Sequence, residues 1–442
     1  MVAHELSRSL ADIVGSAHVL PGEIMQDWTR AFGGPTLTSV RPADTGQLAA
    51  VLSLCSQQRQ PVVLQGGNTG LVAGAVPAAG EQNPPVLLST TRLTDPPQLV
   101  GEHDILAGAG VTLAQVQEFA RSHGRHYGVD LAARDTATIG GTVATNAGGI
   151  RFCKYGSTRH NLRGLEFVTG TGETVTDLTG LPKDNTGLDL TGLICGSEGI
   201  LAVVTQVRLI THPQPPPTLV VLIPVAGLTN ALRIARHVGQ EADLYAAEVI
   251  EAQGWNSVAL ESGAPTVARP LALLLEYATT DEGLSLPIDL MSEDCITVAQ
   301  DPAGKRRLWD TREGQTDHFS RLGLVHKFDV SLPLTAIEPA LDAVTQVARD
   351  TAGVEEVGYF GHIADGNIHI QVLGGEVEAL TERVLRAVTE VGGSISAEHG
   401  IGQAKRQALH LRRQSTEIEL MRRVKAAFDP ANILNPHVLL PQ

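Results

Sequence analysis

Aromatic residues are scarce in this chain. They make up only 4% of its 442 residues, whereas glycine occurs 46 times. Many glycines and few bulky rings favour tight turns and close backbone approaches, as phosphate-binding loops need. An excess of positive charge is also lacking, because the net charge is −15, and this speaks against nucleic acid as the main partner. The length is about three times that of a usual domain, so we expect two or three domains.

Paired cysteines are absent as well. None of the four cysteines forms a CxxC motif, so neither an iron–sulfur cluster nor a zinc ribbon is indicated. Cysteines scattered in this way are most simply reduced core thiols of a cytosolic protein. They are Cys55, Cys153, Cys195 and Cys295.

Long apolar runs and targeting signals are lacking too. No segment approaches the ~18 uninterrupted apolar residues of a transmembrane helix. Residues 1–20 contain no basic stretch followed by an apolar one, so no signal peptide is predicted. We therefore expect a cytoplasmic protein without a transmembrane segment, and peripheral attachment to a membrane stays open.

The two commonest nucleotide-binding motifs are missing. The segment GAGVTL (108–113) has Leu113 where GxGxxG requires its last glycine. A P-loop is excluded because Gly304-Lys305 is followed by Arg306 rather than by serine or threonine. A Rossmann fold and a P-loop fold are both disfavoured.

The pattern of the chain changes at one proline-rich segment. HPQPPPTLV (212–220) has four prolines in six residues and marks the clearest domain boundary. Before it, short β-branched runs alternate with glycines over residues 61–210. After it, residues 326–393 read strand, helix, hairpin, helix, which is typical of an α+β domain. The helices predicted from apolar spacing cover 1–30, 45–60, 229–239, 336–350 and 416–430, and the strands 61–65, 271–278 and 326–332.

Three glycine-rich loops stand beside predicted strands in the first half. QGGNTGLVAGA (65–75) could gather backbone N–H groups around an anion, although alone it is equally compatible with a plain turn. RDTATIGGTVATNAGGIRFCKYGSTRHN (134–161) has almost no side-chain bulk and could line a flat ligand. CGSEGILAVVTQVRL (195–209) is a turn followed by a strand. Three such loops in one region are hard to explain by core packing and indicate an extended nucleotide-like cofactor.

A pair of histidines stands out in GHIADGNIHI (361–370). Asp365-Gly366 is a favoured two-residue hairpin turn, which would place His362 directly opposite His369. Directly opposed side chains have Cβ atoms about 4.5–5.5 Å apart. Two imidazoles held in this way are half of a metal site, although a hairpin pair without metal stays an alternative.

The glycine-rich motifs, taken in order, resemble a known superfamily. PVVLQGGNTGLVAG, ATIGGTVATNAGGIRFCKYG and ICGSEGILAVVT are similar to the FAD-binding domain of the vanillyl-alcohol oxidase / p-cresol methylhydroxylase (PCMH) superfamily. The second half resembles its FAD-linked oxidase C-terminal domain. The likeness runs from about residue 35 to residue 437, includes FDPANILNP (428–436), and is greatest to D-2-hydroxyacid dehydrogenases of the D-2-hydroxyglutarate and D-lactate branch.

The resemblance implies an α+β fold with three parts. A helical lead-in (1–34) precedes a two-subdomain PCMH-type FAD-binding domain (35–214). The FAD-linked oxidase C-terminal domain (215–442) carries the substrate and metal site and includes a C-terminal helical segment (400–442).

The resemblance also implies a set of cofactor contacts. QGGNTG has no histidine, which some superfamily members use to attach the flavin, so we predict non-covalent FAD. The residues implied to contact it are Gly66, Gly67, Asn68, Thr69, Gly70, Leu71, Thr138, Gly140, Gly141, Thr145, Asn146, Glu198, Gly199, Val203 and Asn435.

The same resemblance assigns a metal, and the chemistry of the reaction suggests a base beside it. His362, His369 and Glu398 would hold a divalent ion, with Zn²⁺ expected and Fe²⁺ or Mn²⁺ open on ligand type. His399 would take the substrate's hydroxyl proton, because a neutral imidazole suits proton transfer near pH 7.

Substrate-binding positions are implied in the second half of the chain. Arg312 begins a helix-like run with Thr316 one turn on, and Lys327 lies on the next strand. Without the resemblance, Arg312 would read as an exposed partner of Glu313 or Asp317. Gln371 stands where the hydroxyglutarate branch usually has asparagine, and its extra methylene casts doubt on hydroxyglutarate as the substrate.

We therefore expect an FAD- and metal-dependent dehydrogenase of a D-2-hydroxyacid, with D-2-hydroxyglutarate as the first choice. D-lactate, D-malate, an oxidase that uses O₂ directly, and more remotely a zinc hydrolase are the alternatives. Without an NAD motif or iron–sulfur cysteines, electrons would pass to a separate quinone, cytochrome or electron-transfer flavoprotein. A homodimer is the default expectation.

Overall fold

The computed structural model describes residues 2–279, 296–323 and 325–441. Cys295 lies outside these residues. The chain divides into two compact units, which are described separately. Unit 1 comprises Met1–Gly149, Gly156–Gln214 and Glu398–Gln442, and unit 2 comprises Ile150–Tyr155 and Pro215–Ala397.

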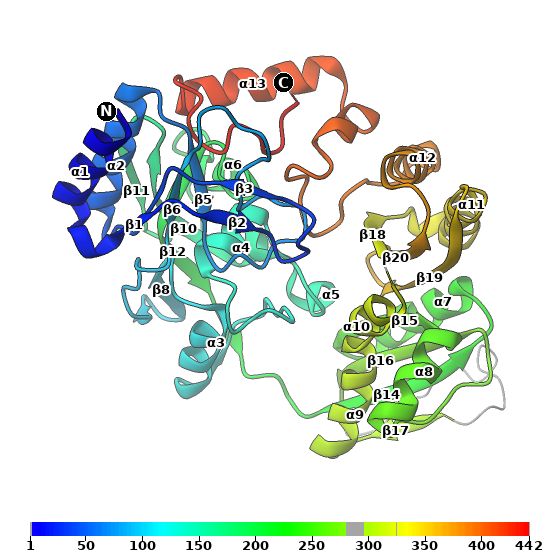
Figure 1. Cartoon of the computed structure of the whole chain (residues 1–442). Coiled ribbons are helices and arrows are strands. Elements are labelled where there is room, and N and C mark those ends of the chain that lie inside the picture. Colours follow the sequence, from blue (N-terminus) through cyan, green and yellow to red (C-terminus); the bar gives the residue numbers. More distant parts are fainter. Residues whose placement is uncertain (1, 280–295, 324, 442) are drawn as a thin grey trace. The chain divides into compact units, whose positions relative to one another are not determined.

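Unit 1 contains a four-stranded sheet in the order β1-β4-β6-β5 (Figure 1). β4, β6 and β5 run parallel, and β1 is antiparallel to β4. Helix α2 begins where the Asp44 side chain accepts a hydrogen bond from Gln47 N (2.8 Å), a typical N-cap. The elements are α1 (Val2–Val14), β1 (Val19–Pro21), β4 (Thr38–Val40), α2 (Thr45–Gln58), β5 (Val62–Gln65) and β6 (Val86–Ser89).

The predicted helical lead-in is wrong in its second half. Helix α1 ends at Val14, and Gly15 follows with a φ of 86°, which a helix cannot continue. Beyond β1, the antiparallel strands β2 (Ile24–Gln26) and β3 (Gly33–Pro35) form a small hairpin.

A second sheet of unit 1 is antiparallel, in the order β11-β10-β12-β8-β7. A two-stranded ribbon pairs β13 with β9. These two sheets account for the glycine-punctuated strands predicted before residue 210. The elements are β7 (Gln98–Val100), β8 (Asp104–Gly108), α3 (Leu113–Ser122), β9 (Arg125–His126), α4 (Ile139–Thr145), β10 (Leu162–Thr169), β11 (Thr174–Asp177), α6 (Leu190–Ile194), β12 (Ala202–Ile210) and β13 (His212–Pro213).

The C-terminal segment belongs to unit 1. Helix α13 (Ser415–Phe428) agrees with the predicted helix, and Leu434 then forms a bridge parallel to Val62 at the start of β5. The division drawn from the sequence had kept residues 400–442 with the second domain. By its contacts Glu398–Gln442 groups with unit 1, and the domain boundaries drawn from the sequence stay a prediction.

Unit 2 is built on a seven-stranded antiparallel sheet, β17-β14-β16-β15-β19-β20-β18 (Figure 1). All eight positions of β16 are buried, so helices cover both faces of the sheet at that strand. The strands are β14 (Thr218–Val225), β15 (Leu244–Glu251), β16 (Leu271–Ala278), β17 (Thr297–Ala299), β18 (Val325–Ser331), β19 (Val354–His362) and β20 (Asn367–Gly374).

The helices of unit 2 fall into two groups. Those of one group pack on one another and share a core with the sheet through Trp255, Leu308 and Phe319. This group is α8 (Ala252–Ser262), α9 (Pro302–Glu313) and α10 (Gln315–Leu322). The other group is α7 (Leu228–Glu241), α11 (Ile337–Arg349) and α12 (Val377–Glu390), which also contact one another. Short helix α5 (Phe152–Tyr155) lies against β15.

The register of the β19–β20 hairpin differs from the prediction. His362 pairs with Asn367, and Phe360 pairs with His369, so four loop residues replace the expected two-residue turn. The loop is closed by Gly366 N donating to His362 O (3.1 Å) and by Asn367 N donating to Asp365 Oδ1 (3.0 Å). The partner of His362 is displaced by two positions, an even shift that keeps both histidines on one face of the sheet.

Candidate active site

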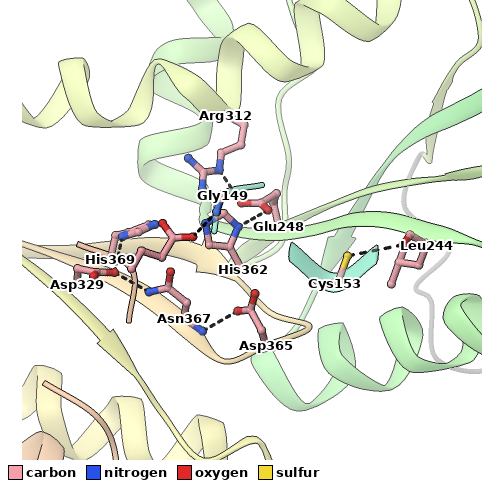
Figure 2. Close-up of polar contacts among 11 residues, drawn as sticks. Gly149, Cys153, Leu244, Glu248, Arg312, Asp329, His362, Asp365, Asn367 and His369 are labelled. Carbon is pink, nitrogen blue, oxygen red and sulfur yellow. Dashed lines mark hydrogen bonds and ion pairs between the residues drawn. The ribbon is translucent and has the colours of Figure 1, made fainter. Parts of the chain in front are cut away.

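The two predicted histidines meet on one face of the unit 2 sheet. Their ring centroids are 5.4 Å apart and the rings are nearly perpendicular, so the pair forms diagonally although its register was mispredicted. His362 Nδ1 lies 2.6 Å from Glu248 Oε1, and His369 Nδ1 lies 3.4 Å from Asp329 Oδ1 (Figure 2). A carboxylate on Nδ1 is the usual support of a metal-binding histidine, which then coordinates through Nε2. The donor set therefore fits a divalent metal.

Arg312 is tied to the same carboxylate as His362. Its Nε donates to Glu248 Oε2 (2.7 Å), and its guanidinium carbon lies 4.9 Å from the centre of the Phe360 ring. Burial alone would raise the pKa of Glu248, but the charges of Arg312 and His362 overcome this and lower it to about 2. The alternative of an exposed Arg312 paired with Glu313 or Asp317 is wrong, because the Arg312 side chain is 9% exposed and pairs with Glu248.

The remaining predicted substrate residues lie on neighbouring elements of unit 2. Lys327 and Gln371 are paired across β18 and β20, and Lys327 Nζ donates to Ser320 Oγ (3.2 Å). Burial lowers the pKa of Lys327, against the opposing effect of Asp317. Gln371 is 3% exposed, and its Oε1 has no hydrogen-bond partner among the described residues.

The helix-like run expected from Arg312 to Thr316 is interrupted. Arg312 lies in the last turn of α9, whereas Thr316 lies in the first turn of α10, and Gly314 separates the two helices. Glycine is required there by a distant part of the chain, since a Cβ at position 314 would lie 2.9 Å from Val258 Cγ1 on helix α8. The one-turn spacing predicted for the two side chains therefore does not come from one continuous helix.

Glu398 and His399 lie in a segment without regular secondary structure at the start of the returning part of unit 1. Glu398 Oε1 accepts a hydrogen bond from Gly149 N (2.9 Å), the last glycine of the NAGG motif. The preceding residue, Ala397, still belongs to unit 2 and donates its N–H to Asp329 Oδ2 (3.2 Å). The last residue of unit 2 before Glu398 is therefore hydrogen-bonded to Asp329, the carboxylate that supports His369.

The three glycine-rich loops converge at the C-terminal end of β5 in unit 1. A Cβ at Gly66 would collide with the Thr138 hydroxyl, so the first loop lies directly against the second. A Cβ at Gly199 would lie 2.9 Å from Asn435 Nδ2 and 2.8 Å from Leu64 Cδ1, so the third loop lies close to the end of β5. A Cβ at Gly70 would meet nothing within 4 Å, so this part of the cradle is open to a ligand.

Several predicted cofactor residues have structural partners in unit 1. Thr138 caps α4 by accepting from Gly141 N (3.3 Å), and Thr145 Oγ1 donates back to Gly141 O (3.1 Å). Asn146 Oδ1 accepts from Arg159 N (3.0 Å), and Gly140 packs closely on the strand end at Ala109. Thr69 and Leu71 are half-buried in the first loop, and Val203 is buried within β12. Their contacts with a flavin stay predictions.

Glu198 supports a backbone segment with its carboxylate. The residue is buried in a left-handed conformation with φ of 52°, and its two oxygens accept from Ile401 N (2.8 Å) and Gly402 N (2.7 Å). Asn435 joins the third loop to β5, because its Nδ2 donates to Glu198 O (2.9 Å) and its Oδ1 accepts from Leu64 N (2.9 Å). Glu198 thus holds the residues that follow His399, a role that the sequence did not reveal.

Two supporting carboxylates were missed from the sequence. Glu248 and Asp329 lie on strands of unit 2, far along the chain from the histidines that they hold. For Glu248 the available signal was an acidic residue in the middle of a largely apolar strand, LYAAEVIE, because such a buried charge needs a partner. The prediction that the cysteines are core thiols holds for Cys55 and Cys195, which are buried, but is wrong for Cys153, which is exposed.

A glycine-lined cradle over two sheets, followed by a sheet domain with a histidine pair, defines a class of FAD-binding flavoproteins. A model of the FAD binding domain matches residues 37–177, and a model of the C-terminal domain of FAD linked oxidases matches residues 214–439. The structure is similar to 4-ethylphenol oxidase from Gulosibacter chungangensis, with a TM-score of 0.74, 15% identity, and 99% and 97% of the two chains covered.

Sequence relatives narrow the family further. The chain is 33% identical to the mitochondrial D-2-hydroxyglutarate dehydrogenase of Bos taurus, over 97% of this chain and 83% of the relative. It is 34% identical to D-2-hydroxyglutarate dehydrogenase of Xanthomonas citri pv. viticola, over 93% and 90%. The chain therefore belongs to the FAD-linked oxidase family together with these dehydrogenases. The predicted α+β fold class and FAD are confirmed, and the described residues include no helix suited to crossing a membrane.

Proposed function

We propose that this protein is an FAD- and metal-dependent dehydrogenase that oxidises a D-2-hydroxyacid to the 2-oxoacid, with D-2-hydroxyglutarate as the first choice. The observation that carries the proposal is the pair His362 and His369, each supported at Nδ1 by a buried carboxylate. A pair built in this way beside a buried arginine suits a metal and an acid substrate. The relatives' names support the reaction and the stereochemistry.

The metal would be held by His362, His369 and Glu398, each of which offers one ligand atom. Two histidines and a carboxylate are a familiar open zinc set, and Zn²⁺ is our first choice among divalent ions. A metal bound there supplies a positive charge that makes a substrate hydroxyl more acidic. The contact between Ala397 and Asp329 supports the assignment of Glu398, because it anchors the chain one residue before this ligand.

FAD would lie non-covalently in the cradle of unit 1, since QGGNTG offers no histidine for attachment. When bound, the flavin supplies an acceptor at N5 for the hydride that leaves C2 of the acid. Gly66 and Gly67 bring the first loop close to the second, and the open surface at Gly70 leaves room for the pyrophosphate. Glu198 and Asn435 also hold this region together through hydrogen bonds to the backbone.

The protein's own residues would bind the acid and move its proton. His399 accepts the hydroxyl proton as C2 loses its hydride. Arg312 binds the carboxylate beside C2 through its terminal nitrogens, which have no hydrogen bond within the described part of the chain. Thr316 and Lys327 assist it, and a half-buried ammonium such as Lys327 attracts an anion more strongly than an exposed one.

Gln371 favours a second group of substrates. It is buried on the strand of His369, and the side-chain oxygen has no partner among the described residues. A polar group buried in this way is paired when a suitable ligand reaches it. Because glutamine is one methylene longer than asparagine, D-lactate or D-malate stay alternatives to the five-carbon acid. Electrons would leave to a separate quinone, cytochrome or electron-transfer flavoprotein, and the protein would form a homodimer.

The test is an anaerobic visible spectrum before and after D-2-hydroxyglutarate, D-lactate and D-malate. We expect one acid to bleach the flavin band, EDTA to abolish the bleaching, and Zn²⁺ to restore it. A second arm uses His399→Ala, which should keep flavin and metal but reduce the flavin far more slowly in stopped flow. Bleaching that survives complete metal removal contradicts the metal assignment, and rapid reoxidation by air would indicate an oxidase.

A further inference from the structure

Glu248 occupies an unusual position in unit 2. It lies in the middle of β15 with no exposed surface. Burying a carboxylate is unfavourable unless charged hydrogen bonds compensate it. The compensation comes from two separate elements, because one partner lies at the end of β19 and the other in the last turn of α9.

The two oxygens of Glu248 are divided between the two partners. Oε1 faces His362 Nδ1 at 2.6 Å, while Oε2 accepts from Arg312 Nε at 2.7 Å (Figure 2). A carboxylate can only accept, so His362 Nδ1 must carry a proton and Nε2 is left as the coordinating atom. On Arg312 the bond takes Nε, and stacking on Phe360 holds the plane of the guanidinium.

We propose that Glu248 is a positioning residue that serves both parts of the site at once, orienting His362 toward a metal and Arg312 toward the substrate carboxylate. The inference rests on the function proposed above. Glu248 itself would touch neither metal nor substrate, so its effect would pass through its two partners. Its loss should therefore weaken metal binding and raise the KM for the acid together.

Glu248→Gln separates these roles with little change in shape. The amide has one acceptor oxygen and one NH₂ group, whereas both partners present N–H donors. With the oxygen toward Arg312, the NH₂ faces His362 Nδ1 and favours the tautomer protonated at Nε2, which cannot coordinate a metal through that atom. With the oxygen toward His362, the NH₂ opposes Arg312 Nε and displaces the guanidinium.

Glu276→Gln is the matched control. Glu276 is also a buried carboxylate, on the neighbouring strand β16. Its partners are the Thr218 hydroxyl (2.9 Å), Trp309 Nε1 (3.1 Å) and Arg151 Nη1 (3.1 Å), none of which we place in the site. The two variants remove the same charge from the same sheet and differ in what the carboxylate holds.

The experiment measures the Zn²⁺ affinity of the flavin-loaded protein by equilibrium dialysis, followed by steady-state kinetics at saturating Zn²⁺. We expect Glu248→Gln to weaken Zn²⁺ binding about 10–100-fold, as for other supporting partners of metal ligands, and to raise KM in addition. Glu276→Gln should stay near the wild type in both. Equal behaviour of the two glutamine variants overturns the proposal, whether both bind Zn²⁺ normally or both weakly.

Two further variants separate the possible failures. His362→Ala must weaken Zn²⁺ binding in its own right; if it does not, the metal site itself fails and the role of Glu248 fails with it. If wild type and His362→Ala differ as expected but Glu248→Gln matches wild type, only the present inference is lost. Should Glu248→Gln not fold, Glu248→Asp keeps the charge but is one methylene too short for both partners. The same joint loss is then expected, and a normal affinity with a normal KM refutes it.

Discussion

The carboxylate of Glu198 offers a direct test of how unit 1 holds the segment after the proposed base. We consider Glu198→Gln, which keeps the shape of the side chain. The wild-type oxygens accept from Ile401 N and Gly402 N, and both of these amides are buried. Glutamine can accept from one amide only, and its NH₂ group then opposes the other.

The magnitude follows from these two hydrogen bonds. The variant loses one hydrogen bond to a charged acceptor and leaves one buried N–H without a partner, which costs about 2–3 kcal/mol. Burial raises the pKa of Glu198, while the two amides and Lys405 lower it, so part of the gain is offset by desolvation. In a unit of this size, about 2–4 °C of melting temperature is lost per kcal/mol, so we expect a fall of roughly 5–10 °C.

The assay combines thermal unfolding with FAD titration and anaerobic flavin reduction. Because the segment that it holds follows His399 directly, flavin reduction should slow at least ~10-fold, while FAD affinity changes less than threefold. Glu173→Gln, an exposed carboxylate of the same unit, should shift stability by less than about 0.5 kcal/mol. A normal melting temperature and a normal rate of flavin reduction, combined with a tenfold loss of FAD affinity, would refute this role of Glu198. That result would favour a direct contact between Glu198 and the flavin.

Three further predictions concern separate positions. Burial raises the pKa of Glu251 to about 7 although its carboxylate accepts from Tyr359 N (3.0 Å); the acid form is favoured in the fold, so stability is lost as pH rises from about 4.5 through 7. Glu251→Gln should therefore be more stable than wild type by about 1–3 kcal/mol at pH 8 but not at pH 4.5, which denaturant melts at the two pH values would measure. Lys425→Met removes a buried ammonium that donates to Asp429 Oδ2 (2.8 Å), and unfolding should become easier by about 3–5 kcal/mol; unchanged melting would contradict this. Gln371→Asn should shift the KM ratio toward D-2-hydroxyglutarate over D-lactate by about tenfold, the effect of one methylene, and an unchanged ratio would remove Gln371 from substrate selection.

Much of the fold was predictable because its signals are local. Apolar spacing gave α7 and α11, and the alternation of strands gave β16 with both ends correct. The lead-in failed where local signals conflict, because residues 15–35 combine turn glycines with strands too short to show a period. The prediction of one helix-like run through Gly314 failed for a different reason. The close contact that requires glycine there involves Val258, which is distant in the sequence.

The candidate site was predictable in its ligands but less so in its geometry. The histidine pair was found by assuming a two-residue turn, and the real loop is longer. The pair formed nevertheless, because a shift of two positions keeps His369 on the face of His362. A shift of one position would have placed the two histidines on opposite faces. The pair was therefore predicted correctly because side chains alternate between faces every second residue, although the predicted turn was wrong.

The supporting carboxylates show where sequence reasoning reaches its limit. Glu248 in LYAAEVIE and Glu276 in LALLLEYA give the same signal, an acid in the interior of a largely apolar strand, and both are buried on neighbouring strands. Their partners nevertheless differ, since Glu248 holds His362 and Arg312, whereas Glu276 holds a threonine, a tryptophan and a second arginine. What separates them is the strand order, which puts β19 beside β15 and so brings His362 opposite Glu248. The sequence thus predicts that a buried acidic residue has a partner. Only the pairing of distant strands decides whether that partner is part of a reactive site.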